Sequence, residues 1–183
     1  MLGVVFTEFL DHVEEKFGLD VVDRIIDESD LPSGAAYTTA TSYDFSEMVA
    51  LVSSLSSVSG YEKSHLIKDF GVALGKRFGT KYKILFDAYP TFFAFINAVD
   101  SHIHAEVQRW HPNANLPTIQ LIQHDDRTGK VIYRSRHCLQ DLAAGIMIAV
   151  ADYYGDKLDI ETSNGTDERG SFINFNVRRT HIE

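Results

Sequence analysis

Three histidines and a glutamate fall within ten residues of one another: His102, His104, Glu106 and His111. Imidazole and carboxylate groups ligate metals, so one reading of this cluster is a metal site. The apolar residues before it repeat with helical spacing, and on a helix residues two apart point about 200° from each other. Such residues do not share one ion. A metal-dependent enzyme built on His102 and His104 is therefore an alternative and not the preferred interpretation.

His104 falls at one margin of the apolar stripe of this helix, and His102 falls at the opposite margin. At about 100° per residue, His104 shares its side of the helix with Phe93 and Asp100. A margin position suits an imidazole that packs on one side and bonds to a carbonyl group or to Asp100 on the other. The same position also permits, without favouring, axial ligation of haem iron.

A second polar group lies where a predicted strand ends, in the run Tyr133-Arg134-Ser135-Arg136-His137. Tyr133 and Ser135 are two residues apart, so their hydroxyl groups project from one face of an extended strand. Two hydroxyl donors with arginines beside them can hold a pair of carboxylates such as the propionates of haem. An exposed polar strand end accounts for the same residues without any ligand.

Helical periodicity dominates the first two-thirds of the chain, and it defines the elements that must position His104. Apolar residues at helical spacing predict helices over 5–17, 21–26, 46–58, 62–78 and 92–107. Gly18, Gly60 and Pro112 are the expected stops.

After Pro112 the period changes to that of strands. Strands are expected over 118–123 and 130–135 around an Asp-Asp-Arg-Thr-Gly turn, then a helix over 139–154, then strands over 157–162 and 171–178 around Asn164-Gly165-Thr166. This order predicts an α+β fold: an N-terminal helical lobe followed by a mixed lobe with an antiparallel sheet and a late helix. One domain is expected over residues 1–183.

The amino-acid composition disfavours several classes of binding partner and of structural site. The chain has 17 basic and 26 acidic residues, a net charge of −9, which disfavours nucleic acid and anionic membranes. Cys138 is the single cysteine, so neither an internal disulfide nor a multi-cysteine zinc site is expected within the monomer. The N-terminus lacks a basic export signal and the apolar run 142–150 is too short to span a membrane, which predicts a cytoplasmic protein.

His104, Pro117, Tyr133 and Ser135 together resemble the signature of the haem nitric oxide/oxygen-binding (H-NOX) domain family, in its bacterial stand-alone form. In that family an axial His is followed thirteen residues later by a Pro that presses on the porphyrin. A Tyr-x-Ser-x-Arg motif begins sixteen residues after the Pro and holds the propionates. The spacing from 104 to 117 to 133 matches without a gap. Gly3, the Asp-Phe-Gly of 69–71 and Gly145 extend the resemblance along the chain.

The resemblance implies haem b (iron protoporphyrin IX) as the cofactor, with His104 as the iron ligand. One position departs from the family motif, because His137 stands where the family has Arg. Imidazole is smaller than a guanidinium and titrates near neutral pH, so weaker or pH-dependent propionate anchoring is expected unless Arg134 or Arg136 takes over. A haem-free interaction module of the same fold is the alternative that this departure suggests.

Relatives that bind oxygen carry a distal Tyr supported by a Trp and an Asn. Carried over by the ungapped register, these positions hold Leu142, Phe9 and Leu74, none of which donates a hydrogen bond. Val5, Phe78 and Ile146 would complete an apolar distal pocket. The resemblance therefore implies a protein that binds NO and CO and forms no stable complex with O₂.

The sequence gives little indication of an enzyme, because it contains neither a nucleophile elbow nor a glycine-rich phosphate loop. The resemblance implies signalling instead: NO binding weakens the bond between iron and His104, the haem relaxes, and a separate partner reads the change. A histidine kinase or a cyclic-di-GMP enzyme (a diguanylate cyclase or phosphodiesterase) is the expected partner. The sequence assigns no role to His111 or Cys138.

Overall fold

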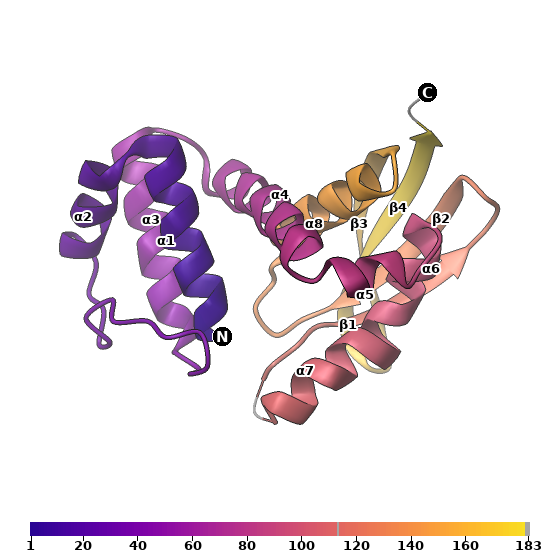
Figure 1. Cartoon of the computed structure of the whole chain (residues 1–183), viewed down its shortest axis with the longest axis horizontal. Helices are drawn as coiled ribbons and strands as arrows, with labels where there is room; N and C mark the ends of the chain where they lie inside the picture. The colour runs from indigo at the N-terminus through magenta and orange to yellow at the C-terminus, as the bar shows by residue number, and fades with distance from the viewer. Residues whose placement is uncertain (113, 182–183) are drawn as a thin grey trace.

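The computed structural model describes residues 1–112 and 114–181. Its helices are α1 (Gly3–Phe17), α2 (Leu19–Asp27), α3 (Phe45–Ser59), α4 (Lys63–Lys81), α5 (Lys83–Asp87), α6 (Phe92–Ala98), the π-helical segment η1 (Val99–Ile103), α7 (His104–Trp110) and α8 (Gln140–Tyr153). Its strands are β1 (Thr118–Gln123), β2 (Thr128–Arg134), β3 (Asp156–Asp167) and β4 (Gly170–His181). Figure 1 shows α1, α2 and α3 as a helical lobe on one side, the sheet on the other, and α4 and α8 between them. The predicted α+β order of helices followed by a sheet is confirmed.

The helical lobe forms because α1 presents one apolar face to its neighbours. Phe6, Phe9 and Val13 follow each other at spacings of three and four residues, and all three are buried. α2 and α3 contribute Ile25 and Leu51 to the same core. The two glycines expected as stops lie at the ends of α1 and α3, where positive φ angles of 91° and 75° suit glycine.

A very close crossing of α4 and α8 connects the helical lobe to the sheet. Gly71 of α4 and Gly145 of α8 face each other there, and a Cβ on Gly145 would collide with the carbonyl oxygen of Lys68. Only glycine allows the two backbones to approach this closely. α4 follows α8 from Leu142 to Tyr153, and α8 also packs on β3 and β4.

The sheet is antiparallel throughout, with the strand order β1-β2-β4-β3. Asp125 stabilises the predicted turn between β1 and β2 by accepting hydrogen bonds from the backbone N–H groups of Arg127 and Thr128. Within β2, Tyr133 pairs with Ile119 on one side and Ile173 on the other.

The turn predicted around Asn164-Gly165-Thr166 is wrong. β3 and β4 pair continuously through these residues, and the chain reverses between Asp167 and Gly170. The physical reason lies across the ladder, where the ring of Phe172 covers Gly165 so closely that a Cβ there would overlap it. Gly165 therefore makes room for an aromatic side chain, and the turn moves to the end of the hairpin.

The single helix predicted over 92–107 is also wrong, because η1 separates α6 from α7. The backbone N–H of His104 donates to the carbonyl oxygen of Val99, five residues earlier. Such a π turn inserts one extra residue and rotates the next turn of helix by about 100° relative to an uninterrupted α-helix. The helical wheel drawn from Phe93 therefore does not give the direction of His104.

The buried apolar residues form two clusters, one in the helical lobe and one between the sheet, α6 and α8. Phe78 of α4 and Ile146 of α8 pack against both clusters. Among the described helices, none is both long enough and apolar enough to cross a membrane.

Candidate haem-binding site

His104 begins α7, directly after the π turn, and its side chain is 17% exposed. Its Nδ1 atom is buried and lies 3.5 Å from Oδ1 of Asp100, which is too long for a hydrogen bond; no other described residue bonds to Nδ1. Burial lowers the pKa of His104 below its ordinary value, and the opposing effects of Asp100 and of the Pro117 backbone are smaller. The imidazole is therefore neutral at pH 7, the form that ligates metals.

Pro117 lies beside His104, as its effect on the imidazole indicates. The two neighbours expected for a boundary histidine, Asp100 and a backbone carbonyl group, both flank His104, the carbonyl group being that of Pro117. Because Asp100 faces Nδ1, the ring nitrogen left for a metal is Nε2. A carboxylate placed at the far side of a ligating imidazole is a common orienting arrangement.

The other members of the histidine cluster do not converge on His104. His102 is exposed, and its Nδ1 lies 3.1 Å from the hydroxyl group of Tyr89. Glu106 pairs with Arg109 on the surface. Across residues 1–112 and 114–181, no group of three His, Cys, Asp or Glu side chains is arranged to hold a metal ion. The metal-enzyme alternative gains no geometric support from these residues.

Tyr133 and Ser135 are brought together at the end of β2. The ring of Tyr133 is 4% exposed and packs edge-on against Phe175. Burial raises the pKa of the Tyr133 hydroxyl, and a hydrogen bond with Ser135 opposes that rise. Two hydroxyl groups of this kind can donate to carboxylates.

The two neighbouring arginines differ in what they contact. Arg134 lies on the opposite face of β2, where its Nη2 atom is 2.5 Å from Asp167 and its guanidinium covers the ring of Phe172 at 4.5 Å. Because Arg134 is bound to the β3–β4 hairpin, it is not available to bind a propionate in place of the family Arg. Arg136 is exposed, and no hydrogen bond or ion pair joins it to the described residues.

His137 does not extend into solvent as a free cation. Its ring stacks on Phe45 with centroids 4.2 Å apart, and its Nε2 atom lies 3.1 Å from Nδ2 of Asn115. Burial lowers the pKa of His137, Arg136 adds to that effect, and Asp44 opposes it. Sequence reasoning missed Phe45 and Asn115, and nothing in their local sequence signals this contact.

The six residues expected on the distal side come from three helices and are all apolar. Phe9 and Leu74 are buried at 1% and 2% exposure, and the other four are half-buried. These are Val5 of α1, Phe78 of α4, and Leu142 and Ile146 of α8. The arrangement offers a gas molecule an apolar environment without a hydrogen-bond donor from these six side chains.

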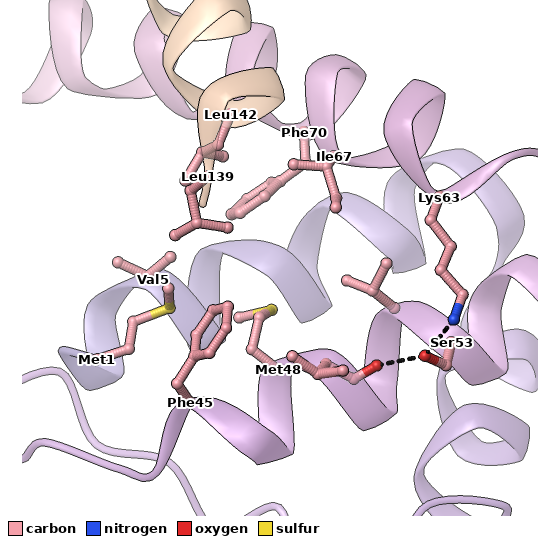
Figure 2. A pocket seen from close by; sticks show the side chains of 12 residues that line it. Met1, Val5, Phe45, Met48, Ser53, Lys63, Ile67, Phe70, Leu139 and Leu142 are labelled. Carbon is pink, nitrogen blue, oxygen red and sulfur yellow. Dashed lines mark hydrogen bonds between the residues drawn. The ribbon is translucent and has the colours of Figure 1, made fainter. Parts of the chain in front are cut away.

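Val5 and Leu142 also line a pocket of about 100 Å³ between α1, α3, α4 and the start of α8. Figure 2 shows that the side chains facing it are almost all apolar, with Phe70 and Met48 on opposite walls. Their polar contacts lie at one edge, where Lys63 donates to Ser53 over 2.8 Å and the Ser53 hydroxyl donates to the backbone carbonyl oxygen of Val49 over 2.6 Å.

These residues fit a haem group on three counts. A buried neutral imidazole has a nitrogen available for iron, paired hydroxyl groups stand ready for propionates, and apolar side chains from the helical lobe supply the opposite wall. The fold and this set of side chains are those of a haem-binding α+β sensor domain.

Comparison with known proteins identifies the family. The family model described as Haem-NO-binding matches residues 2–162, and the chain belongs to this H-NOX family. The Fe(II) unliganded H-NOX protein from K. algicida is 30% identical, with 99% of this chain and 97% of that chain covered and a TM-score of 0.90. None of the curated protein sequences compared with the chain matches it significantly.

Two further solved structures share the fold. The H-NOX protein from Shewanella woodyi, bound to IWP-051 in the Fe(II)CO state, is 28% identical over 98% of this chain and 95% of that chain, with a TM-score of 0.82. The S. oneidensis H-NOX protein in the Fe(II)NO state is 21% identical over 99% and 100%, with a TM-score of 0.87. The family consists of haem-binding gas-sensor domains and is not an enzyme family.

Proposed function

We propose that this protein, as one domain over residues 1–183, senses nitric oxide through ferrous haem b held by His104. The observation that carries the proposal is the buried His104 imidazole: it is neutral, it faces Asp100 through Nδ1, and it lies beside Pro117. The match to the Haem-NO-binding family model supports NO as the ligand. Carbon monoxide is a second ligand, which the Fe(II)CO state of the Shewanella woodyi relative supports.

Haem, when bound, supplies the iron to which NO and CO coordinate. His104 would ligate that iron, Pro117 would contact the porphyrin, and Tyr133 and Ser135 would donate hydrogen bonds to the propionates. Val5, Phe9, Leu74, Phe78, Leu142 and Ile146 line the distal side. Because these six side chains carry no donor, they give bound O₂ no hydrogen bond, and the protein discriminates against O₂.

Release of His104 is the signalling step of this proposal. With haem held by His104, binding of NO would weaken the hold of His104, and relief of the contact at Pro117 would let the helical lobe move against the sheet. The change becomes a signal when a partner binds the two arrangements unequally. A histidine kinase or a diguanylate cyclase or phosphodiesterase is the partner that a stand-alone domain of this family would regulate.

The absorption spectrum tests the proposal. The protein is expressed with haem supplied, reduced without oxygen, and recorded before and after NO, CO and air. The expected result is a haem spectrum that changes with NO and with CO and shows no oxy complex in air. A stable oxy complex in the wild-type protein would overturn the ligand preference.

His104→Gly tests the route of the signal. With imidazole added to support haem binding, this variant should adopt the NO-bound arrangement before NO is present, because the bond that NO breaks is already missing. Hydrogen exchange in the helical lobe measures the arrangement. Exchange that still changes with NO as in the wild type would refute release of His104 as the step.

A haem-free interaction module is the second candidate, and the orientation of His137 favours it. His137 stacks on Phe45 where the family motif has an Arg, so one anchor for the propionates is missing. A well-folded protein without a Soret band would establish this alternative. For the sensor, His137→Arg should slow haem transfer to an acceptor protein by about 10- to 150-fold, since a charged donor to a carboxylate contributes about 1.5–3 kcal/mol. Unchanged transfer would mean that the departure at 137 is unrelated to haem retention.

A further inference from the structure

His137 contacts two segments distant in the sequence and also Ser135, two residues before it. Its ring stacks on Phe45, the first residue of α3 in the helical lobe. Its Nε2 atom meets Asn115, two residues before Pro117. Its backbone N–H donates to the Oγ atom of Ser135 over 3.2 Å. One residue thus joins the lobe to both segments that the proposed function places against haem.

In the contact with Asn115, the imidazole of His137 is the acceptor. The Nδ2 atom of Asn115 donates, so Nε2 of His137 accepts, as a neutral ring with its proton on Nδ1 does. A guanidinium has donors and no acceptor, so an Arg at 137 loses this bond and meets Asn115 only through Oδ1, after the amide turns over. The departure from the family motif therefore exchanges a contact with haem for a contact within the protein.

We propose that His137 is a positioning residue that couples the haem-contacting segments around Pro117 and Ser135 to α3 through its stack on Phe45. The proposal rests on the proposed haem function. It assigns His137 a role other than propionate binding: displacement of the Pro117 segment moves Asn115, Asn115 moves the ring, and the ring moves the start of α3.

The start of α3 is well placed to pass this displacement on. Phe45 packs against the apolar cluster of the helical lobe and also lines the pocket shared with Val5 and Leu142. Asp44 fixes the helix end by accepting a hydrogen bond from the Ser46 backbone N–H over 2.8 Å. A shift of Phe45 is therefore carried by a rigid helix end instead of being absorbed in a loop.

A double-mutant cycle tests the contact itself. Phe45→Leu, His137→Ala and the double variant are unfolded in urea, and their folding constants are compared with that of the wild type. The expected result is a non-additive cycle, with a coupling of about 2- to 12-fold in the folding constant, the range measured for aromatic pairs. Phe17→Leu is the matched control, because Phe17 is a half-buried ring of the same lobe that lies near the ring of Tyr61, with centroids 6.2 Å apart. An additive cycle would overturn the contact.

The haem spectrum tests the coupling. In the haem-bound protein, Phe45→Leu should shift the out-of-plane porphyrin bands in resonance Raman spectra, although α3 provides none of the proposed haem contacts. The same substitution should have no effect once His137→Ala is present, and Phe17→Leu should leave the bands unchanged. A Phe45→Leu shift that persists without His137 would overturn the coupling. A protein that binds no haem overturns the proposed function and this coupling together, while the urea cycle still decides the contact.

Discussion

Leu142 is the distal side chain at which the oxygen preference can be reversed. Leu142→Tyr places a hydroxyl group where the distal side has no donor, and one hydrogen bond to bound O₂ contributes about 1 kcal/mol or more. The O₂ affinity of the ferrous protein should rise by at least about fivefold. Leu142→Phe is the matched control, because it adds the ring without the hydroxyl group. Equal O₂ affinities of the Tyr and Phe variants, measured from absorption spectra at graded oxygen pressures, would contradict the prediction.

Single residues differ in how well the sequence predicts their surroundings. Tyr133 and Ser135 are brought together as their spacing on a strand predicts, because two residues apart on a strand share a face. His137 and Phe45 are 92 positions apart, and no periodicity links them. That stack depends on how the helical lobe meets the end of β2. The pattern of residue types along the chain does not predict how two distant elements pack against each other.

The close approach of α4 and α8 leads to a prediction about stability. Gly145→Ala should lower the free energy of unfolding by about 1–3 kcal/mol, because the added Cβ collides with the backbone carbonyl of Lys68 and forces the two helices apart. Gly79→Ala is the matched control in α4: its Cβ would meet no backbone atom of another element, only the rings of Tyr153 at 3.1 Å and Phe86 at 3.7 Å, and alanine favours the helix. Urea unfolding of both variants measures the difference. Equal stabilities would mean that the crossing tolerates separation.

Helices and strands were predictable from the sequence where a single spacing of apolar residues continues through the whole segment. The helices of the lobe and the turn at Asp125 follow their patterns, because amphipathic spacing and turn chemistry act locally. The π turn before His104 was not predictable, since one inserted residue leaves the apolar residues on both sides unchanged in type. The Asn164-Gly165 turn failed for the opposite reason: a strong local turn signal was overridden by Phe172 on the neighbouring strand.

The two lobes are joined by more than apolar packing. Asp69 of α4 accepts hydrogen bonds through Oδ2 from both His12 and Lys16 of α1, at 2.8 and 2.6 Å. Arg77, two turns further along α4, donates to Glu8 of α1 over 2.8 Å. α1 is therefore fixed to α4 by polar contacts, and any movement of the helical lobe against the sheet must either carry α4 along or break these bonds.

Asp69→Asn tests which of the two occurs. Partial burial raises the pKa of Asp69, but the hydrogen bonds and charges of Lys16 and His12 outweigh it and lower the pKa below its ordinary value of 3.8. A lowered carboxyl pKa stabilises the fold above pH 3.8, and this stabilisation is lost as the pH falls through the folded-state value. Asp69→Asn should therefore reduce the free energy of unfolding by about 1 kcal/mol at pH 7, and by progressively less in acid. Asp23→Asn, at an exposed position of α2, is the control for the loss of one carboxylate. If the lobe moves by breaking these bonds, Asp69→Asn also raises hydrogen exchange in α1 before NO is added and diminishes the change that NO produces. If α1 and α4 move together, the exchange response to NO is the same in the variant and the wild type.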